Sequence, residues 1–172
     1  MERFRKMKAL YIHGLQSNPN PKKLDIIESF ELDVISPFID YEKEKGEVYE
    51  RVKSLAIENN IDLIIGSSLG GFIAYWLSKD LEKPALLFNP ALYFESMQTF
   101  IPLVDPNKIA PLYICLGEKD PQVNPLDVRA YIDKQNPQHQ KLKIVVASWL
   151  QHGIDLQTFK SMISWFLSEV NV

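Results

Sequence analysis

The sequence predicts an α/β protein built on a mostly parallel, six-stranded, doubly wound sheet. Short apolar runs alternate with amphipathic stretches from one end of the chain to the other. Most apolar runs are continuous, which is typical of strands that are covered on both faces. Each link between them is short and holds about one helix-like stretch. We therefore expect right-handed crossovers between parallel strands.

Six segments are predicted to be strands because they are short, apolar and bounded by turn-forming residues. They are Ala9–His13, Asp33–Pro37, Ile61–Ser67, Ala85–Asn89, Leu112–Gly117 and Leu142–Ala147. Five stretches between or after them are predicted to be helices, since their apolar residues recur at helical spacing. They are Pro21–Phe30, Glu47–Asn59, Gly71–Leu81, Pro125–Lys134 and Ile154–Val170.

The stretch 90–111 departs from this alternation. It is too apolar for a free loop, and it includes Phe94, Met97 and Phe100. Two interpretations remain open at this point, a helix of the core or a small cap over a site. With that exception the chain 1–172 is expected to form a single domain, because its length suits one core and no repeat or linker interrupts it.

Composition excludes several classes of function. The chain is 46% hydrophobic and 24% charged with a formal net charge of −3, so nucleic acid is not an expected partner. No run reaches the length of a membrane span, and no secretory leader is evident, so we expect a cytoplasmic protein without a membrane partner. The single cysteine, Cys115, lies in a predicted strand and is expected to be buried. The three histidines lack metal-binding spacing, so no metal is expected.

The most informative motif is Gly66-Ser67-Ser68-Leu69-Gly70, which reads G-x-S-x-G. It follows a predicted strand and precedes a predicted helix. That context is the one in which a serine hydroxyl is held on a tight turn, clear of the sheet, with small residues on either side. The plainer interpretation is a glycine-rich turn whose serine caps the helix. Strand–turn–helix context favours a nucleophile at Ser68 over this interpretation, and Ser67 is expected to be only a structural neighbour.

An acid and a histidine also follow predicted strands. Asp120 comes after the fifth strand and His152 after the sixth. Because the carboxyl ends of parallel strands meet at one edge of the sheet, Ser68, Asp120 and His152 should lie near each other. The rival acids are Asp127, expected inside a helix, and Asp155, expected in the first turn of the last helix, where a carboxylate is favoured. Among the other histidines, His13 is expected to shape the turn after the first strand, and His139 to lie in a polar loop.

The chain resembles the α/β-hydrolases and, more narrowly, the small YqiA-like esterase family. The resemblance rests on these segments: Tyr11-Ile12-His13-Gly14, Ser17-Asn18-Pro19, Gly66-Ser67-Ser68-Leu69-Gly70-Gly71-Phe72, Phe88-Asn89-Pro90-Ala91, and His152-Gly153. It covers essentially the whole chain and implies a compact α/β-hydrolase fold. It also implies a serine-dependent ester or thioester hydrolase. The segment Gly117–Val123, which holds the acid, matches the family pattern only approximately.

The expected chemistry is acyl transfer to water. Ser68 is the expected nucleophile, His152 the general base, and Asp120 the residue that orients the imidazole. The backbone N–H groups of Leu69 and Leu15 are expected to form the oxyanion hole. The expected substrate is a small acyl ester or thioester, which Gly14 would let approach and which Phe94 and Met97 would contact; no cofactor is implied. The alternatives are a non-catalytic binding protein on this fold and an amidase or peptidase.

Overall fold

A computed structural model describes residues 5–93, 101–135 and 141–171 of the chain. Its six strands form one sheet in the order β2-β1-β3-β4-β5-β6, and all five pairings are parallel. The prediction of a doubly wound parallel sheet is therefore confirmed. The strands are β1 (Lys8–Ile12), β2 (Asp33–Ile35), β3 (Leu63–Ser67), β4 (Ala85–Phe88), β5 (Leu112–Gly117) and β6 (Leu142–Ala147).

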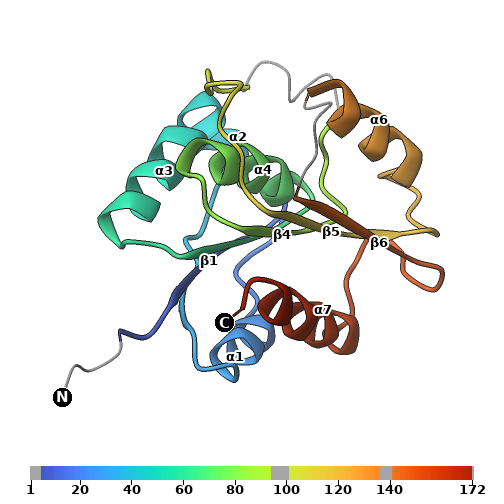
Figure 1. Cartoon of the computed structure of the whole chain (residues 1–172), viewed down its shortest axis with the longest axis horizontal. Helices are drawn as coiled ribbons and strands as arrows, with labels where there is room; N and C mark the ends of the chain where they lie inside the picture. Colours follow the sequence, from blue (N-terminus) through green and yellow to red (C-terminus); the bar gives the residue numbers. More distant parts are fainter. Residues whose placement is uncertain (1–4, 94–100, 136–140, 172) are drawn as a thin grey trace.

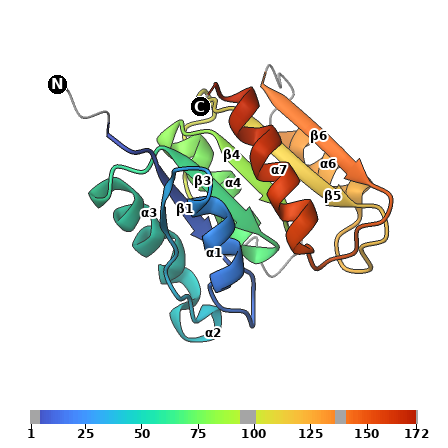
Figure 2. The same ribbon diagram turned by 90° about the horizontal axis from the view of Figure 1, so that it is seen from below.

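Helices cover both faces of this sheet (Figure 1). One face carries α2 (Tyr41–Glu44), α3 (Val48–Glu58), α4 (Leu69–Leu81) and α6 (Pro125–Gln135), with a short 3₁₀ turn, η1 (Lys45–Glu47), between α2 and α3. The other face carries α1 (Pro21–Glu28) and α7 (Leu156–Glu169), which lie side by side (Figure 2). This arrangement of three layers explains why the strands read as continuous apolar runs.

Alternate residues of the strands supply two separate cores. In β1, Leu10 and Ile12 pack in the core beneath α3 and α4. Ala9 and Tyr11 pack in the opposite core, beneath α1 and α7. All four side chains are almost fully buried. A single strand therefore contributes to both layers, which fixes its register and the position at which its carboxyl end emerges.

The predicted and observed elements differ mainly in where helices begin and in the length of one strand. Helix α4 begins at Leu69, two residues before the predicted start, because the turn at Ser68 leads directly into the helix. Helix α2 lies outside the predicted elements, and η1 overlaps the predicted helix only at Glu47. The Asp40 carboxylate accepts a hydrogen bond from the Lys43 N–H and so starts α2. Strand β2 is only three residues long, whereas five were expected.

Part of the segment 90–111 can be assigned. Residues 101–111 contain a turn but neither helix nor strand, and Ile101 and Leu103 reach the surface. The expected contacts from Phe94, Met97 and Phe100 lie outside the described residues, so the two interpretations of this segment stay open. Among the described residues, no helix is long and apolar enough to cross a membrane.

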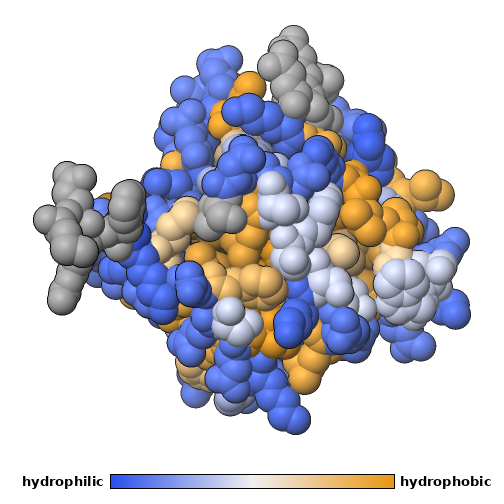
Figure 3. Space-filling model, turned by 60° about the horizontal axis from the view of Figure 1, so that its bottom comes forward, coloured by the Kyte–Doolittle hydropathy of each residue, from blue (hydrophilic) through white to orange (hydrophobic). Residues whose placement is uncertain are grey.

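Hydrophobic side chains also reach the surface in the middle of the face that Figure 3 presents, and hydrophilic side chains surround them. Scattered apolar exposure of this kind is ordinary for a folded domain. Cys115 is fully buried in β5, as expected, and burial raises its pKa to about 12. A thiol in that state is a poor nucleophile.

Candidate active site

Ser68 lies on a strained turn between β3 and α4. Its backbone has φ 53° and ψ −118°, a conformation that is uncommon for residues other than glycine. A Cβ atom at Gly66 would lie 2.4 Å from the carbonyl oxygen of Gly70, and one at Gly70 would lie 2.2 Å from the Ile12 oxygen. Both glycines are therefore required by close packing around the turn. The Ser68 side chain does not cap the helix, which leaves its hydroxyl available for another partner.

That partner is His152, in the loop after β6. The Ser68 Oγ lies 3.0 Å from His152 Nε2, and His152 Nδ1 lies 2.8 Å from Asp120 Oδ2. A carboxylate only accepts hydrogen bonds, so Nδ1 carries the ring proton and Nε2 can accept the serine proton. The His152 side chain is 22% exposed and the Asp120 side chain is fully buried. The structure thus brings the three predicted residues into a continuous hydrogen-bonded relay.

The loop after β5 holds Asp120 in place. Its Oδ1 accepts hydrogen bonds from the backbone N–H groups of Gln122 and Val123, at 2.7 and 3.0 Å. Both carboxylate oxygens are therefore occupied, one by the loop and one by the imidazole. This is a geometry that fixes the direction in which the carboxylate points.

The two rival acids lie elsewhere in the structure. The Asp155 carboxylate caps α7, where it accepts hydrogen bonds from the N–H and the hydroxyl of Thr158. Those hydrogen bonds lower the pKa of Asp155. Asp127 is exposed in the first turn of α6. Neither carboxylate has His152 among its hydrogen-bond partners.

The predicted oxyanion residues lie beside the Ser68 turn. Leu69 is the first residue of α4, and a backbone N–H at that position has no partner within the helix. The loop after β1 approaches from the other side, where a Cβ at Gly14 would lie 3.2 Å from the Ser68 Cβ. Leu15 follows in that loop with its side chain half-exposed. The structure therefore puts both loops next to Ser68, while the role of their N–H groups stays a prediction.

His13 supports the loop after β1 rather than facing the relay. Its Nδ1 lies 2.8 Å from the Gly14 carbonyl oxygen, and its Nε2 accepts the Ile39 N–H at 3.0 Å. The Tyr41 hydroxyl also donates to the His13 carbonyl, at 2.6 Å. Burial lowers the pKa of His13, although the Gly14 hydrogen bond opposes this shift. His13 is thus a buried neutral ring that shapes the turn, in agreement with the expectation from its position.

One residue beside the site was given no role in the sequence analysis, although it lies in the segment Phe88-Asn89-Pro90-Ala91 that contributes to the family resemblance. Asn89 follows β4 with φ 41°, is fully buried, and makes hydrogen bonds to the loops that hold Asp120 and His152. The feature of the sequence that could have identified Asn89 is an asparagine before Pro90, at the carboxyl end of an apolar strand. Asparagine tolerates positive φ and offers both a donor and an acceptor, so that position favours it.

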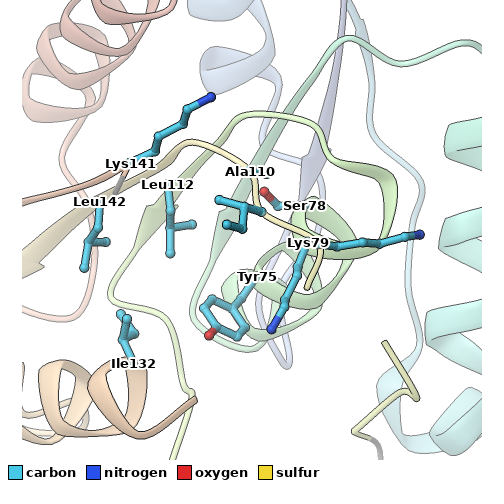
Figure 4. Close-up of a pocket in the computed structure, with 10 residues that line it drawn as sticks. Tyr75, Ser78, Lys79, Ala110, Leu112, Ile132, Lys141 and Leu142 are labelled. Atoms are coloured by element: carbon cyan, nitrogen blue, oxygen red, sulfur yellow. The ribbon is translucent and has the colours of Figure 1, made fainter. Parts of the chain in front are cut away.

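A cavity elsewhere in the molecule is unrelated to this relay. It has a volume of about 30 Å³ and lies between α4, α6 and the amino ends of β5 and β6, where Leu112 and Leu142 line it (Figure 4). That end of the sheet is opposite to the end that carries Ser68. Lys79 and Lys141 also line it, but their amino groups point in different directions (Figure 4). Among the described residues, no group of three or more acidic, histidine or cysteine side chains could hold a metal ion.

Comparison with solved structures shows the fold alone, because the identities are low. A protein of the alpha/beta superfamily of hydrolases from Xanthomonas campestris pv. campestris is 17% identical with a TM-score of 0.72, over 96% of this chain and 99% of that one. Est1E from Butyrivibrio proteoclasticus is 11% identical with a TM-score of 0.74, over 98% and 90%. A monoacylglycerol lipase from Paleococcus ferrophilus is 12% identical with a TM-score of 0.72, over 94% of each chain.

A family model also matches the chain. The family is described as "Uncharacterised protein family (UPF0227)", and the match covers residues 8–113. This range includes β1, the Ser68 turn and Asn89, but ends before Asp120 and His152. The chain belongs to this family, and its fold is similar to that of the solved hydrolases.

Proposed function

We propose that the protein is a serine hydrolase that cleaves small carboxylic esters or thioesters through an acyl-serine intermediate. One observation carries the proposal, the hydrogen-bonded relay from Ser68 through His152 to the buried Asp120. A serine hydroxyl is a weak nucleophile until a base accepts its proton, and an imidazole is a weak base until a carboxylate stabilises its charged form. A binding protein has no need of this sequence of contacts.

The proposed reaction has two halves. In the first, Ser68 Oγ attacks the carbonyl carbon of the ester while its proton passes to His152 Nε2. The tetrahedral intermediate then expels the alcohol or thiol, which takes that proton from Nε2. In the second half, His152 accepts a proton from water, and the resulting hydroxide attacks the acyl-serine. Collapse returns the proton to Ser68 Oγ and releases the carboxylic acid.

The negative charge of each tetrahedral intermediate needs hydrogen-bond donors. The N–H of Leu69 at the start of α4 and the N–H of Leu15 are the donors we propose. One such donor is typically worth about 3–4 kcal/mol of the reaction barrier. The close approach of the Gly14 loop to Ser68 and the unpaired N–H groups at a helix start support this assignment.

Labelling with a fluorophosphonate tests the proposal directly. The reagent should modify Ser68, as peptide mass mapping would show, and Ser68→Ala should lose both the label and the hydrolysis of p-nitrophenyl acetate. Ser67→Ala is the matched control, since Ser67 is the neighbouring serine at the end of β3; it should keep the label. Folded protein that takes up no label would point to a non-catalytic binding protein instead.

We further propose that the substrate has a short acyl group. The half-exposed side chain of Leu15, in the loop beside Ser68, and the partly exposed side chain of His152 support a shallow, accessible site. Each methylene buried in an apolar pocket contributes only about 1 kcal/mol, so a shallow site gains little from long chains. Across nitrophenyl esters of increasing acyl length, kcat/KM should fall beyond short chains. A steady rise up to long-chain esters would require a deep acyl tunnel and contradict this prediction.

A further inference from the structure

We propose that Asn89 is a positioning residue that holds the base loop and the acid loop in the geometry of the relay. The base loop is 148–153, which carries His152, and the acid loop is 117–123, which carries Asp120. The proposal rests on the proposed function, because it concerns the alignment of that relay. The hydrogen bonds of the Asn89 side chain go to backbone groups and not to the three reacting side chains, so we expect any effect on chemistry to pass through the backbone of the two loops.

The side chain of Asn89 uses both ends of its amide. Its Nδ2 donates to the carbonyl oxygens of Gln151 and His152, at 2.9 and 3.1 Å. Its Oδ1 accepts the N–H of Gly117 at 2.7 Å. Two adjacent carbonyls of the base loop are thus fixed at the position of the histidine itself, and the same amide plane is fixed to the first residue of the acid loop.

The backbone around Asn89 extends these contacts to the serine turn. The Ser68 N–H donates to the Phe88 oxygen at 2.9 Å, and the Ala91 N–H donates to the Ser68 oxygen at 3.0 Å. The Asn89 N–H itself donates to the Cys115 oxygen in β5. The segment from Phe88 to Ala91 therefore has hydrogen bonds to all three loops that carry the relay.

The base loop and the acid loop also touch each other. A Cβ at Gly117 would lie 2.5 Å from the Leu150 oxygen and 2.8 Å from the Gln151 oxygen, and the Lys119 N–H donates to Leu150. The carbonyl groups of the base loop are therefore closely confined by Gly117, and the Asn89 amide donates hydrogen bonds to two of them. Because Asn89 is fully buried, loss of its amide would leave three backbone groups without a partner.

A displacement of the histidine backbone matters because alignment contributes strongly to the rate. A misplacement of about 1 Å can reduce the rate by about 10²-fold. The same displacement has little effect on the binding of a small ester, which contacts the Ser68 turn and the loop after β1. If Asn89 positions the histidine, its variants should lose kcat. If Asn89 contributes only to stability, the molecules that remain folded should keep the wild-type kcat and KM.

Two variants of Asn89 separate these cases. Asn89→Gly removes the amide and suits the positive φ of the backbone, so the turn is retained. Asn89→Asp keeps the size and an acceptor for Gly117 while the donors to the base loop are lost. Ser78→Ala is the matched control: Ser78 is as buried and its hydroxyl donates to the Lys83 carbonyl, at the far end of α4. All three, with wild type, are measured by kcat and KM on p-nitrophenyl acetate and by melting temperature.

We expect Asn89→Gly and Asn89→Asp to lose about 10–100-fold in kcat, with KM changed less than about threefold. Ser78→Ala should lower the melting temperature with kcat unchanged. NMR of the His152 ring, assigned by its absence in His152→Gln, supplies a readout that needs no turnover. The Nδ1 proton shared with Asp120 should be visible in wild type and broadened or lost in both Asn89 variants.

Folded Asn89 variants with wild-type kcat and an unchanged His152 signal would overturn the positioning role while leaving the proposed function intact. A wild type without esterase activity would instead overturn the proposed function. In that case the His152 signal still decides whether Asn89 sets the geometry of the base loop, since its loss in the variants supports the contact and its persistence contradicts it.

Discussion

His13 and His152 lie at the same edge of the sheet, in the loops after β1 and β6, yet their surroundings differ completely. Both ring nitrogens of His13 are hydrogen-bonded to backbone groups, and the residue is 1% exposed. Both ring nitrogens of His152 are hydrogen-bonded to side chains, and its side chain is partly open to solvent. A ring with backbone partners on both sides can hold a loop, whereas a ring between a carboxylate and a hydroxyl can move a proton.

The two loops also differ in what stabilises them. The loop after β1 depends on its own histidine, through Gly14, Ile39 and the hydroxyl of Tyr41. The loop after β6 depends on a residue from another strand end, Asn89. The His13 ring thus stabilises its own loop through backbone hydrogen bonds, whereas the His152 ring, proposed for catalysis, makes its hydrogen bonds to side chains. A change at His152 should therefore reduce activity with little effect on stability, whereas a change at His13 should reduce both.

The largest effect is expected from His152→Ala. Loss of the proposed base should reduce kcat/KM for nitrophenyl acetate by on the order of 10⁴–10⁶-fold. The melting temperature should change little, because the His152 ring is partly exposed and its hydrogen bonds go to side chains, those of Asp120 and Ser68. A variant that keeps more than about a tenth of the wild-type rate would end the distinction between the two histidines.

Asp120→Asn should have the next largest effect. The asparagine amide can donate its N–H to His152 and so favour the wrong tautomer of the imidazole. The same change in a Ser-His-Asp protease reduces kcat by about 10⁴-fold. Asp127→Asn and Asp155→Asn are the matched controls and should stay within a few-fold of wild type by the same assay. If either control is inactive and Asp120→Asn is active, the acid has been assigned to the wrong loop.

His13→Ala should affect both activity and stability, unlike a change at His152. The Ile39 N–H and the Gly14 carbonyl would lose a buried partner, which costs about 1–3 kcal/mol for each unsatisfied group. A loss of about 2–3 kcal/mol lowers the melting temperature by about 4–12 °C in a chain of this size. Displacement of Leu15 should reduce kcat by about 10–10³-fold. Thermal denaturation and ester kinetics on the same preparation check both; an unaffected melting temperature would contradict the structural role.

The smallest effect concerns pH. Burial lowers the pKa of His13 in the folded protein from its ordinary 6.5, so the unfolded chain binds the proton more readily. The free energy of unfolding should therefore rise with pH up to about 6.5 and fall as the medium becomes more acidic. His13→Gln lacks the titrating group. Urea unfolding at several pH values should show a weaker acid loss of stability in that variant, and equal slopes would refute the prediction.

Much of the site could be predicted because its residues follow strand ends. Ser68, Asp120 and His152 each come directly after or shortly after an apolar run, and parallel strands bring such positions together. Asp155 was expected at the start of the last helix, and it caps α7; Asp127 was expected within a helix, and it lies in the first turn of α6. These inferences needed only local pattern and the rule that parallel strands share an edge.

What the sequence could not supply depends on contacts between distant segments. Asn89 is 62 and 63 residues from the two carbonyls it binds, and nothing local to it reveals those partners. Helix α2 and the η1 turn were not predicted, because Asp40 acts through local capping and the Tyr41 hydroxyl through a hydrogen bond to the loop after β1. Neither contact produces an apolar periodicity in the sequence. Helix boundaries differed by a residue or two for the same reason, as at Leu69.

The position of β6 at the edge of the sheet has a consequence for biosynthesis. Ser68 and His152 are 84 residues apart, and the histidine follows β6, the sixth strand along the chain. A nascent chain that extends only through the loop after β5 already contains the serine turn and Asp120 but lacks the histidine that would act as base. Since chains emerge with the N-terminal part first, the hydroxyl stays unactivated until the segment through His152 has followed. On the proposed mechanism, a growing chain on the ribosome cannot hydrolyse the esters around it until β6 and the loop after it have joined the fold.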